Sequence, residues 1–244
     1  MTEQFVKSDS ARLWTRAEGS GIPIVLCNGG PGCSDYLAPV SAMLDDLAQV
    51  IRFEARGCGR SDAVPPYTVA TCLADLEAIR QQYGIERWIV GGHSAGADLA
   101  LAYTLAYPAR VYGFICISGG RIHNDREWHR IYSERRDQGL EILPRFDYPP
   151  NLEVNAAVNH SWKEYIQRPS LLKEIAYLDR LALFVYGERD IRPSWPVEQV
   201  AQLLPNATFQ MIADADHHIW VTHPEELQTP LRAFVQQIAQ ADRQ

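Results

Sequence analysis

Short, continuous apolar runs alternate with segments of helical periodicity along this chain, and this alternation constrains the fold more than any other feature of the sequence. Because each run is apolar throughout, rather than at every second residue, both faces of the resulting sheet should be covered. Strands that alternate with helices favour the α/β class, with a mostly parallel, doubly wound sheet. The predicted strands are residues 22–27, 49–53, 87–90, 111–118, 181–186 and 208–212.

The segments between these strands have the spacing of amphipathic helices. In one of them, Val69, Leu73 and Ile79 recur at helical intervals. The last helix ends near residue 239, and it starts near Pro224, or near Pro230 if that proline marks a first helical turn. The first residues are predicted to form an antiparallel hairpin at one edge of the sheet, from residues 4–6 and 12–16. The other helices are predicted at 36–47, 68–83, 97–107 and 196–204.

Residues 121–177 break this rhythm, because no strand pattern appears in them. A charged helix is predicted at 125–136 and another helix at 161–177, on either side of a proline-rich stretch. The segment is longer than an ordinary crossover between parallel strands. We therefore expect a core formed by residues 1–120 and 178–244, with residues 121–177 as a small helical cap over the ends of the strands.

The balance of charge disfavours several classes of partner. The 244 residues include 23 Lys or Arg and 30 Asp or Glu, which gives a formal net charge of -7. Such a surface repels phosphate backbones and anionic membranes, so neither a nucleic acid nor a membrane is an expected partner. No apolar run approaches the ~18 residues of a membrane span, and residues 1–10 lack the apolar core of a signal peptide. The expected partner is a small molecule or small peptide, and the sequence carries no signal for an oligomeric state.

The cysteine and histidine contents bear on compartment and cofactors. The five cysteines are odd in number and no pair has C-x-x-C spacing, so a reducing, cytoplasmic location is predicted. His123, His129 and His160 are scattered through residues 121–177 without ligand spacing. We therefore expect neither a metal ion nor another cofactor.

The sequence Gly92-His93-Ser94-Ala95-Gly96 fits the pattern G-x-S-x-G. A predicted strand precedes it and a predicted helix follows it, which is the strand–turn–helix setting that this motif needs. Small residues let the backbone turn sharply and hold the serine at the tip, where the N-terminus of the following helix favours negative charge. Ser94 is therefore the candidate nucleophile, and the alternative is a glycine turn with an exposed serine.

The candidate base and acid follow the last two predicted strands. A serine hydroxyl near neutral pH needs a base that takes its proton, and with this motif the acid and then the histidine follow the serine along the chain. His217 and His218 come just after the last strand, and one of the two is the candidate base. Asp190 follows the preceding strand and can accept the histidine Nδ1–H and stabilise the imidazolium. Glu188 competes with Asp190 for this role, and Asp190 could instead cap the next helix.

A glycine-rich turn, N-G-G-P-G at residues 28–32, follows the first parallel strand. Such glycines free backbone N–H groups to point into a site where an oxyanion develops. We expect Gly30 to supply one donor, and Ala95, the residue after the nucleophile, to supply the other. The alternative is a plain turn.

Together these segments resemble the proline iminopeptidase-like α/β hydrolases. The turn at 28–32 is similar to their H-G-G-P-G signature, and residues 54–61 are similar to their D-x-R-G-x-G-x-S segment. Residues 186–193 resemble their acid loop. Residues 214–227 resemble their histidine segment, in which the motif histidine aligns with His217.

This resemblance implies an α/β-hydrolase fold with a catalytic triad of Ser94, Asp190 and His217, and with Gly30 and Ala95 as the oxyanion hole. It implies a serine hydrolase that cleaves a small ester, lactone or amide through an acyl-enzyme. A proline iminopeptidase acting on small peptides is the alternative. A lyase, a cofactor-free oxygenase or a ligand receptor on the same fold are further alternatives, because one fold supports many functions.

The sequence departs from the family pattern at several positions. Asn28 stands where the family has histidine, Glu54 where it has aspartate, and Asp216 where glycine is common. Asp98 lies one helical turn after Ser94 and could buttress the site. Proline iminopeptidases use acidic residues, mainly in the cap, to hold the N-terminal ammonium of a substrate. Acidic residues available in this segment include Glu127, Glu134, Glu141, Glu153 and Glu164, and no motif selects one of them.

Overall fold

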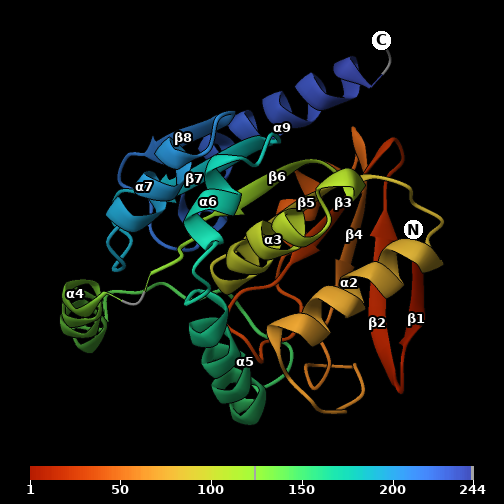
Figure 1. Ribbon diagram of the computed structural model, residues 1–244, viewed down its shortest axis with the longest axis horizontal. Coiled ribbons are helices and arrows are strands. Elements are labelled where there is room, and N and C mark those ends of the chain that lie inside the picture. Colours follow the sequence, from red (N-terminus) through yellow and green to blue (C-terminus); the bar gives the residue numbers. More distant parts are fainter. Residues whose placement is uncertain (124, 243–244) are drawn as a thin grey trace.

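A sheet of eight strands forms the centre of the molecule (Figure 1). The computed structural model describes residues 1–123 and 125–242. The strands are β1 (Thr2–Ser8), β2 (Ala11–Glu18), β3 (Ile22–Cys27), β4 (Ala48–Phe53), β5 (Trp88–His93), β6 (Val111–Ile117), β7 (Leu181–Gly187) and β8 (Ala207–Ile212). In the order β1-β2-β4-β3-β5-β6-β7-β8, antiparallel pairing within the described ranges is confined to β1–β2 and β2–β4. The prediction of a mostly parallel, doubly wound sheet is thus confirmed.

Helices cover both faces of this sheet. One face carries α2, α3, α6 and α7, and the other carries α1, α8 and α9. Such two-sided cover is what the uninterrupted apolar strands require. The bounds of the helices are α1 (Ala38–Ala42), α2 (Val69–Gln82), α3 (Ala95–Ala106), α4 (Arg126–Asp137), α5 (Leu152–Tyr165), α6 (Leu171–Ala176), α7 (Trp195–Leu203), α8 (Ile219–Thr222) and α9 (Pro224–Ala241).

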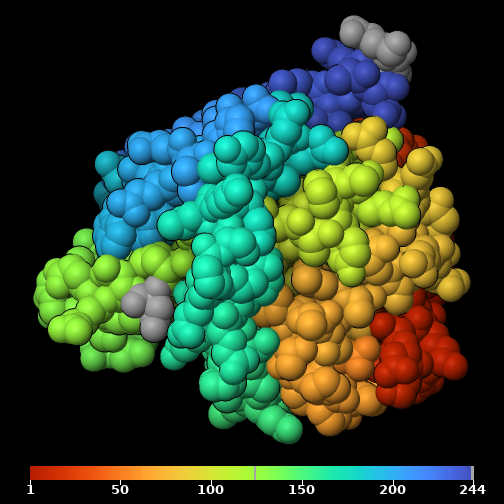
Figure 2. Space-filling view, viewed as in Figure 1, coloured from red at the N-terminus to blue at the C-terminus, as the bar shows by residue number. Residues whose placement is uncertain are grey.

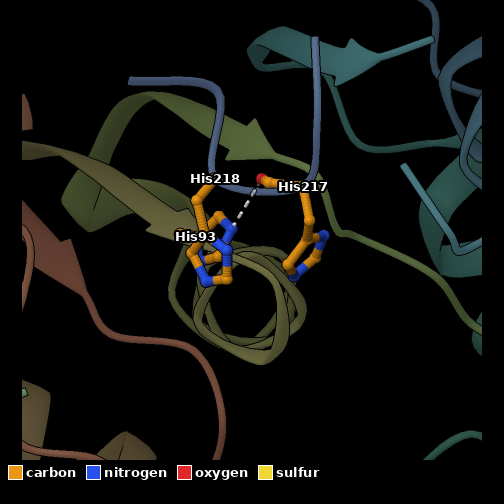
Figure 3. Close-up of side chains that lie close together, drawn as sticks. All are labelled: His93, His217 and His218. Atoms are coloured by element: carbon orange, nitrogen blue, oxygen red, sulfur yellow. Dashed lines mark hydrogen bonds between the residues drawn. The ribbon is translucent and has the colours of Figure 1, made fainter. Parts of the chain in front are cut away.

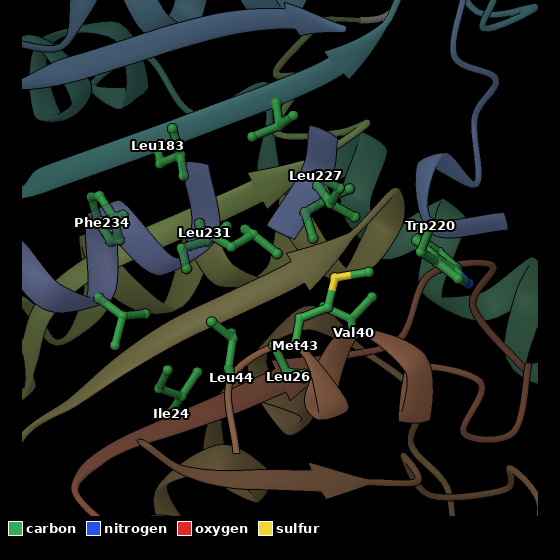
Figure 4. Close-up of a cluster of buried hydrophobic side chains, with 14 of the residues drawn as sticks. Ile24, Leu26, Val40, Met43, Leu44, Leu183, Trp220, Leu227, Leu231 and Phe234 are labelled. Atoms are coloured by element: carbon green, nitrogen blue, oxygen red, sulfur yellow. The ribbon is translucent and has the colours of Figure 1, made fainter. Parts of the chain in front are cut away.

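Alternate residues of the parallel strands divide the core into two layers. Ile24 and Leu26 of β3 point toward α1 and α9, where they pack in one cluster with Leu231 (Figure 4). Val25, between them, packs on the opposite side with Leu76 of α2. Because successive side chains of a strand point to opposite faces, every residue of β3 needs an apolar environment.

The structure differs from the sequence prediction between β6 and β7. The single helix predicted at 161–177 is wrong, since this stretch holds the end of α5 and all of α6, with Pro169 between them. Proline cannot supply the N–H that a helix interior needs. α5 also begins earlier than predicted, because Asn151 Oδ1 accepts hydrogen bonds from two amides of its first turn, at 3.0 and 3.3 Å.

Other differences lie at the ends of elements. The helix predicted at 36–47 shortens to α1, and turns follow it, with the Leu44 N–H donating to the Ser41 carbonyl three residues back. β5 continues through the glycines to His93, so the strand runs directly into the G-x-S-x-G turn. α9 begins at Pro224, and Pro230 lies inside it.

Residues 121–177, which we call the cap segment, contain α4, α5 and α6. The Asn151 N–H at the start of α5 donates to the Gly32 carbonyl at 2.9 Å, and its side-chain Nδ2 donates to the Gly57 carbonyl at 2.9 Å. α5 therefore sits over the loops that follow β3 and β4, and Figure 2 shows it between α4 and α2. α6 instead packs into the core, through Leu171 and Ile175. Among the described helices, none combines the length and the apolar character needed to cross a bilayer.

Candidate active site

Ser94 stands on a sharp turn between β5 and α3. Its backbone is held at φ 54° and ψ −123°, a region that side-chain-bearing residues seldom adopt. The glycines on either side make the turn possible. A Cβ on Gly92 would meet the Gly96 carbonyl oxygen at 2.1 Å, and a Cβ on Gly96 would meet the Cys27 carbonyl oxygen at 2.1 Å. The spacing of the G-x-S-x-G motif is thus a steric requirement of this backbone.

Asp190 and His217 meet at the same edge of the sheet as Ser94. Asp190 follows β7 and His217 follows β8, and the two side chains are joined by a 2.6 Å hydrogen bond between His217 Nδ1 and Asp190 Oδ2. Both residues are buried, at 3% and 2% exposure. Because the carboxylate accepts the Nδ1–H, the lone pair of the neutral ring lies on Nε2.

Hydrogen-bond partners distinguish His217 from His218, and they distinguish Asp190 from Glu188. His218 donates from Nδ1 to the Ile142 carbonyl of the cap segment, at 2.9 Å. Glu188 accepts from the Asp214 N–H, at 3.1 Å, on the surface of the loop. Of these candidates, His217 and Asp190 are therefore the two that the structure brings together.

Ser94 and His217 line one cavity, together with Gly30 and Tyr36. Among the described side chains, the Ser94 hydroxyl has no hydrogen-bond partner, so its Oγ and His217 Nε2 are not bonded to each other here. Such contacts are often long in an unliganded site and shorten when a substrate is bound. The arrangement leaves both reacting atoms open to a ligand.

Burial dominates the electrostatics of the acid and the histidine. It lowers the pKa of His217 well below the usual value, and the nearby cations of Arg192 and Arg121 lower it further. Burial also raises the pKa of Asp190 to about 6, against the opposing effect of Arg192. Arg192 donates to Asp190 Oδ1 from its backbone N–H at 2.9 Å and from Nη1 at 3.4 Å. The imidazole is therefore neutral near pH 7, as a general base must be.

Two backbone amides beside Ser94 are free to bind an oxyanion. Gly30 adopts a positive φ of 53°, and Gly30 and Ala95 line a second cavity together with Ser94. Within the described chain, the amides of Gly30 and Ala95 have no hydrogen-bond acceptor. The Gly29 N–H, in contrast, donates to the Tyr36 hydroxyl at 2.7 Å. Gly30 and Ala95 are thus the available donors at the positions that the sequence predicts.

The departures at Asn28 and Glu54 have structural explanations. Asn28 Nδ2 donates to the Phe53 carbonyl at 2.8 Å, and Asn28 Oδ1 accepts from the Tyr36 N–H at 3.2 Å. Glu54 is fully buried and accepts from the backbone N–H of Arg60 at 2.5 Å. Both side chains therefore hold the loops that follow β3 and β4 in place.

A buried chain of hydrogen bonds links the two sides of the site, and the sequence analysis did not identify it. The Tyr36 hydroxyl accepts from Gly29 and donates to His93 Nδ1, at 2.7 Å. His93 Nε2–H then donates to the His217 carbonyl, at 3.1 Å, as Figure 3 shows. The loop after β3, which contains Gly29 and Gly30, is thereby connected to the loop after β8, which contains His217. The connection passes through His93, the variable residue of the G-x-S-x-G motif. The sequence feature that could have identified His93 is its position directly before Ser94.

His93, His217 and His218 bring ring nitrogens within 4.8 Å of one another. This cluster does not suit a metal ion, because most of its nitrogens already have partners. Both nitrogens of His93 are hydrogen-bonded, and Nδ1 of each of the other two rings bonds Asp190 or Ile142. A metal bound to His93 would have to break one of the two hydrogen bonds of this ring.

The cap carboxylates differ in their distance from Ser94. Glu141 lines the cavity that contains Ser94 and His217, and its Oε1 accepts from Arg192 Nη1 at 2.7 Å. Arg192 is another residue that the sequence analysis missed, although it lies two positions after Asp190. Glu127, Glu134 and Glu164 pair with surface residues of their own helices, and Glu153 is exposed.

Comparison with known proteins agrees with this architecture. A family model described as alpha/beta hydrolase fold matches residues 22–149. A proline iminopeptidase from Saccharolobus solfataricus is 34% identical over 170 residues, which cover 66% of this chain and 54% of the relative. A putative carbamate hydrolase, RutD, from Caulobacter segnis is 26% identical over 243 residues, which cover 87% of this chain and 91% of the relative. The chain spans about half the length of the curated proline iminopeptidases it matches.

Solved structures share the fold at low sequence identity. A thermophilic esterase from Thermogutta terrifontis superposes with a TM-score of 0.79 at 21% identity, covering 98% of this chain and 100% of the esterase. The proline iminopeptidase of Mycobacterium smegmatis superposes with a TM-score of 0.77 at 17% identity, covering 99% of this chain and 100% of the other. At such identities the likeness establishes the fold and leaves the chemistry to the site.

Proposed function

The chain belongs to the α/β-hydrolase fold family, and from this premise we propose that it is a serine hydrolase that cleaves a small ester, lactone or amide. The observation that carries the proposal is the 2.6 Å hydrogen bond between His217 Nδ1 and Asp190 Oδ2. It lies at the sheet edge where Ser94 stands on its strained turn. A nucleophile, a base and a group that orients the base are the three parts that acyl transfer needs.

In the first half of the proposed reaction, Ser94 Oγ attacks the substrate carbonyl while His217 Nε2 takes the hydroxyl proton. Asp190 holds the ring in the required tautomer and stabilises the imidazolium. The negative oxygen of the tetrahedral intermediate accepts from the Gly30 and Ala95 amides. His217 then gives its proton to the leaving atom, and the acyl group remains on Ser94.

In the second half, water enters and His217 takes one of its protons. The hydroxide attacks the acyl carbonyl, and the negative oxygen that forms again accepts from the Gly30 and Ala95 amides. His217 returns the proton to Ser94 as the carboxylic acid departs. No step requires a metal or an organic cofactor.

The cap segment completes the proposal. We assign residues 1–120 and 178–244 to the hydrolase core and residues 121–177 to a cap that bounds the substrate site. A small substrate fits the two cavities beside Ser94, of about 240 and 280 Å³. The cytoplasmic location predicted from the cysteines is part of the same proposal, and all five cysteines are free.

Proline iminopeptidase activity is the second candidate, because relatives of that name share 34–35% identity with part of this chain. Such an enzyme needs a carboxylate for the substrate ammonium. The cap carboxylate beside Ser94 is Glu141, and it is already paired with Arg192. This pairing favours an ester, lactone or uncharged amide, and the small carbamate class of the putative RutD relative falls within the same chemistry.

The decisive test is labelling with a fluorophosphonate, read by intact mass, together with hydrolysis of short-chain p-nitrophenyl esters and of proline p-nitroanilide. We expect one adduct per chain, absent in Ser94→Ala, and turnover of the esters. Removal of a nucleophile of this kind lowers kcat by about 10⁶-fold. A matched control is Ser10→Ala, at an exposed turn. Failure of the wild type to be labelled and to turn over any of these substrates would overturn the proposal, and turnover of the anilide alone would select the iminopeptidase.

A further inference from the structure

The two cavities that meet at Ser94 have different roles in the proposed reaction, on which this inference rests. A general acid protonates the leaving atom, so the leaving group must lie beside His217. The cavity that includes His217 is lined by Leu143 and Phe146 and by the ion-paired Glu141 and Arg192, and it faces the leaving group. The other cavity contains Ser94 and both oxyanion donors but not His217, so it faces the acyl half of the substrate.

Two cations line the acyl-side cavity, and of these Arg192 is already paired with Glu141 and Asp190, which leaves Arg121. It lies four residues after β6 and lines the cavity with its side chain 29% exposed. Its guanidinium lies over the ring of Trp128, with Cζ 4.1 Å from the centroid, and this contact restricts its position. Its ion-pair partner among the described residues is Asp98, whose Oδ2 is 4.0 Å from Arg121 Nε. Among the described residues no acceptor is hydrogen-bonded to this guanidinium, so its N–H groups are available to a ligand.

Two side-chain oxygens of this cavity already accept hydrogen bonds. Asp98 Oδ1 accepts from the backbone amides of Gly120 at 2.8 Å and Arg121 at 3.0 Å. Asn155 Oδ1 accepts from Asn159 Nδ2 at 3.1 Å. With these oxygens engaged, the Arg121 cation makes the cavity complementary to an anionic ligand.

We infer that Arg121 binds a carboxylate at the far end of the acyl group, so that the substrate is a monoester or monoamide of a dicarboxylic acid. A guanidinium presents two parallel N–H groups to a carboxylate, which fixes orientation as well as charge. Trp128 holds that fork in place. The leaving-group cavity and the cationic acyl cavity together position the scissile carbonyl at Ser94.

An ammonium group is disfavoured in the same cavity. It would lie near Arg121, and like charges repel in a partly buried site. The carboxylate of Asp98 is held by two backbone amides and by Arg121, so it is not free to bind an ammonium group. The inference thus predicts a preference opposite to that of an aminopeptidase.

The test compares kcat/KM for monomethyl succinate, glutarate and adipate with that for methyl esters of unbranched monocarboxylic acids of equal length, followed by pH-stat at pH 7.5. We expect at least one acid-terminated ester to be preferred by about tenfold to a hundredfold, the range that hydrogen bonds to charged groups provide. In Arg121→Met this ratio falls to about one, and Arg121→Lys restores part of it. Arg130→Met, at an exposed position of α4, serves as the matched control and keeps the wild-type ratio.

A second variant tests the direction of the effect. Asp98→Asn keeps an oxygen for the Gly120 and Arg121 amides but removes a negative charge 4.0 Å from Arg121 Nε. The preference for the acid-terminated ester should therefore rise by about threefold to tenfold, since each ~1.4 kcal/mol corresponds to a factor of ten. A fall in the ratio would contradict the assignment of Arg121 as the binding group.

Binding to Ser94→Ala separates this inference from the proposed function. Calorimetric titration with glutarate and adipate should give a signal that disappears in the double variant Ser94→Ala/Arg121→Met. If the wild type is labelled by the fluorophosphonate but shows no preference among the ester pairs and no dicarboxylate binding, the inference is wrong and the proposed function stands. If labelling fails while dicarboxylate binding depends on Arg121, the cavity assignment stands without the hydrolase.

Discussion

At the scale of single residues, two buried side chains connect the loops of the candidate site. Tyr36 is 7% exposed and bridges the Gly29 amide and the His93 ring. His93 is 1% exposed and in turn donates a hydrogen bond to the His217 carbonyl. A buried polar network of this kind is stable only while each member keeps its partners. The position of His217 is therefore coupled to the shape of the loop after β3, which contains Gly29 and Gly30.

Tyr36→Phe tests this coupling. The change removes the acceptor of the Gly29 N–H and the donor of His93 Nδ1, and leaving such buried groups unpaired should lower the free energy of unfolding by about 1–3 kcal/mol. We also expect kcat to fall by about tenfold with KM little changed, because positioning and not binding is lost. Tyr177→Phe, at a residue 77% exposed, is the control. Equal kcat values in the two variants would show that the network does not support catalysis.

The pH dependence of kcat/KM tests the role of Arg192. His217 acts when neutral and Asp190 when ionised, so activity is lost as pH falls through their pKa values. Burial holds the pKa of His217 below 6.5 and that of Asp190 at about 6, so we expect the acid limb below pH 6.5. The Arg192 cation lowers both pKa values, and Arg192→Gln should therefore move the limb to higher pH.

The control for this profile is Arg189→Gln, in the same loop. The Arg189 side chain is 65% exposed and pairs with Asp214. Arg189→Gln should have its acid limb of kcat/KM at the same pH as the wild type, because solvent screens an exposed charge. The charged and titratable groups around His217 are Asp190, Arg192, Arg121, His93 and His218. Coincident limbs for wild type and Arg192→Gln would refute the role given to Arg192.

At the scale of elements, the contact between α5 and the strand loops determines where the cap segment lies. Asn151 both caps α5 and bonds the loop after β4. Gly32 allows this approach, since a Cβ there would meet the Asn151 carbonyl oxygen at 2.2 Å. From its second turn onward, α5 presents Asn155 and Asn159 to the acyl-side cavity. One anchoring residue thus couples helix stability to the shape of the site.

Two substitutions at Asn151 separate these contributions. Asn151→Ala removes the cap and the bond to Gly57, and we expect a loss of about 1–2 kcal/mol in urea unfolding together with lower kcat/KM. Asn151→Asp keeps a capping oxygen but cannot donate to the Gly57 carbonyl, so it should retain most of the stability and still lose activity. Wild-type stability in Asn151→Ala would contradict the capping role.

At the scale of the whole molecule, one buried ion pair joins three elements at the edge of the sheet. Arg56, in the loop after β4, donates to Asp75 of α2 at 2.8 and 2.6 Å. Ser8 at the end of β1 donates to Asp75 Oδ1 at 2.5 Å. The side chains of Arg56 and Asp75 are 5% and 2% exposed. The segment that resembles the D-x-R-G-x-G-x-S motif therefore connects the N-terminal hairpin to the parallel sheet.

Asp75→Ala should lower the free energy of unfolding by about 3–5 kcal/mol, because it leaves the Arg56 guanidinium buried without its counter-charge. The double variant Asp75→Ala/Arg56→Met should recover part of this loss, since removing both charges avoids the unpaired one. Asp137→Ala, which breaks an exposed pair with Arg136, should change the free energy by less than about 1 kcal/mol. Urea unfolding measures all three, and a double variant less stable than Asp75→Ala would refute this account.

The sequence by itself determined the class of the fold and the order of most elements, because the periodicity of apolar residues is a local property. It predicted the strand–turn–helix around Ser94 for the same reason, since the glycines at 92 and 96 are required by the backbone next to them. The choice between His217 and His218 came from a resemblance, and their roles in catalysis stay predictions. The helix predicted at 161–177 was wrong because its apolar spacing continued past the break at Pro169.

Only the tertiary structure decided which side chains from distant loops meet. Arg192 reaches Glu141 across 51 positions, and Tyr36 reaches His93 across 57. Arg121 lines the cavity beside Ser94 because the loop after β6 returns to the end of β5. No local pattern encodes such meetings, because they depend on the register of neighbouring strands and on the path of the loops that leave them. The sequence thus gives the elements, and their packing determines the charge and shape of the space in front of Ser94.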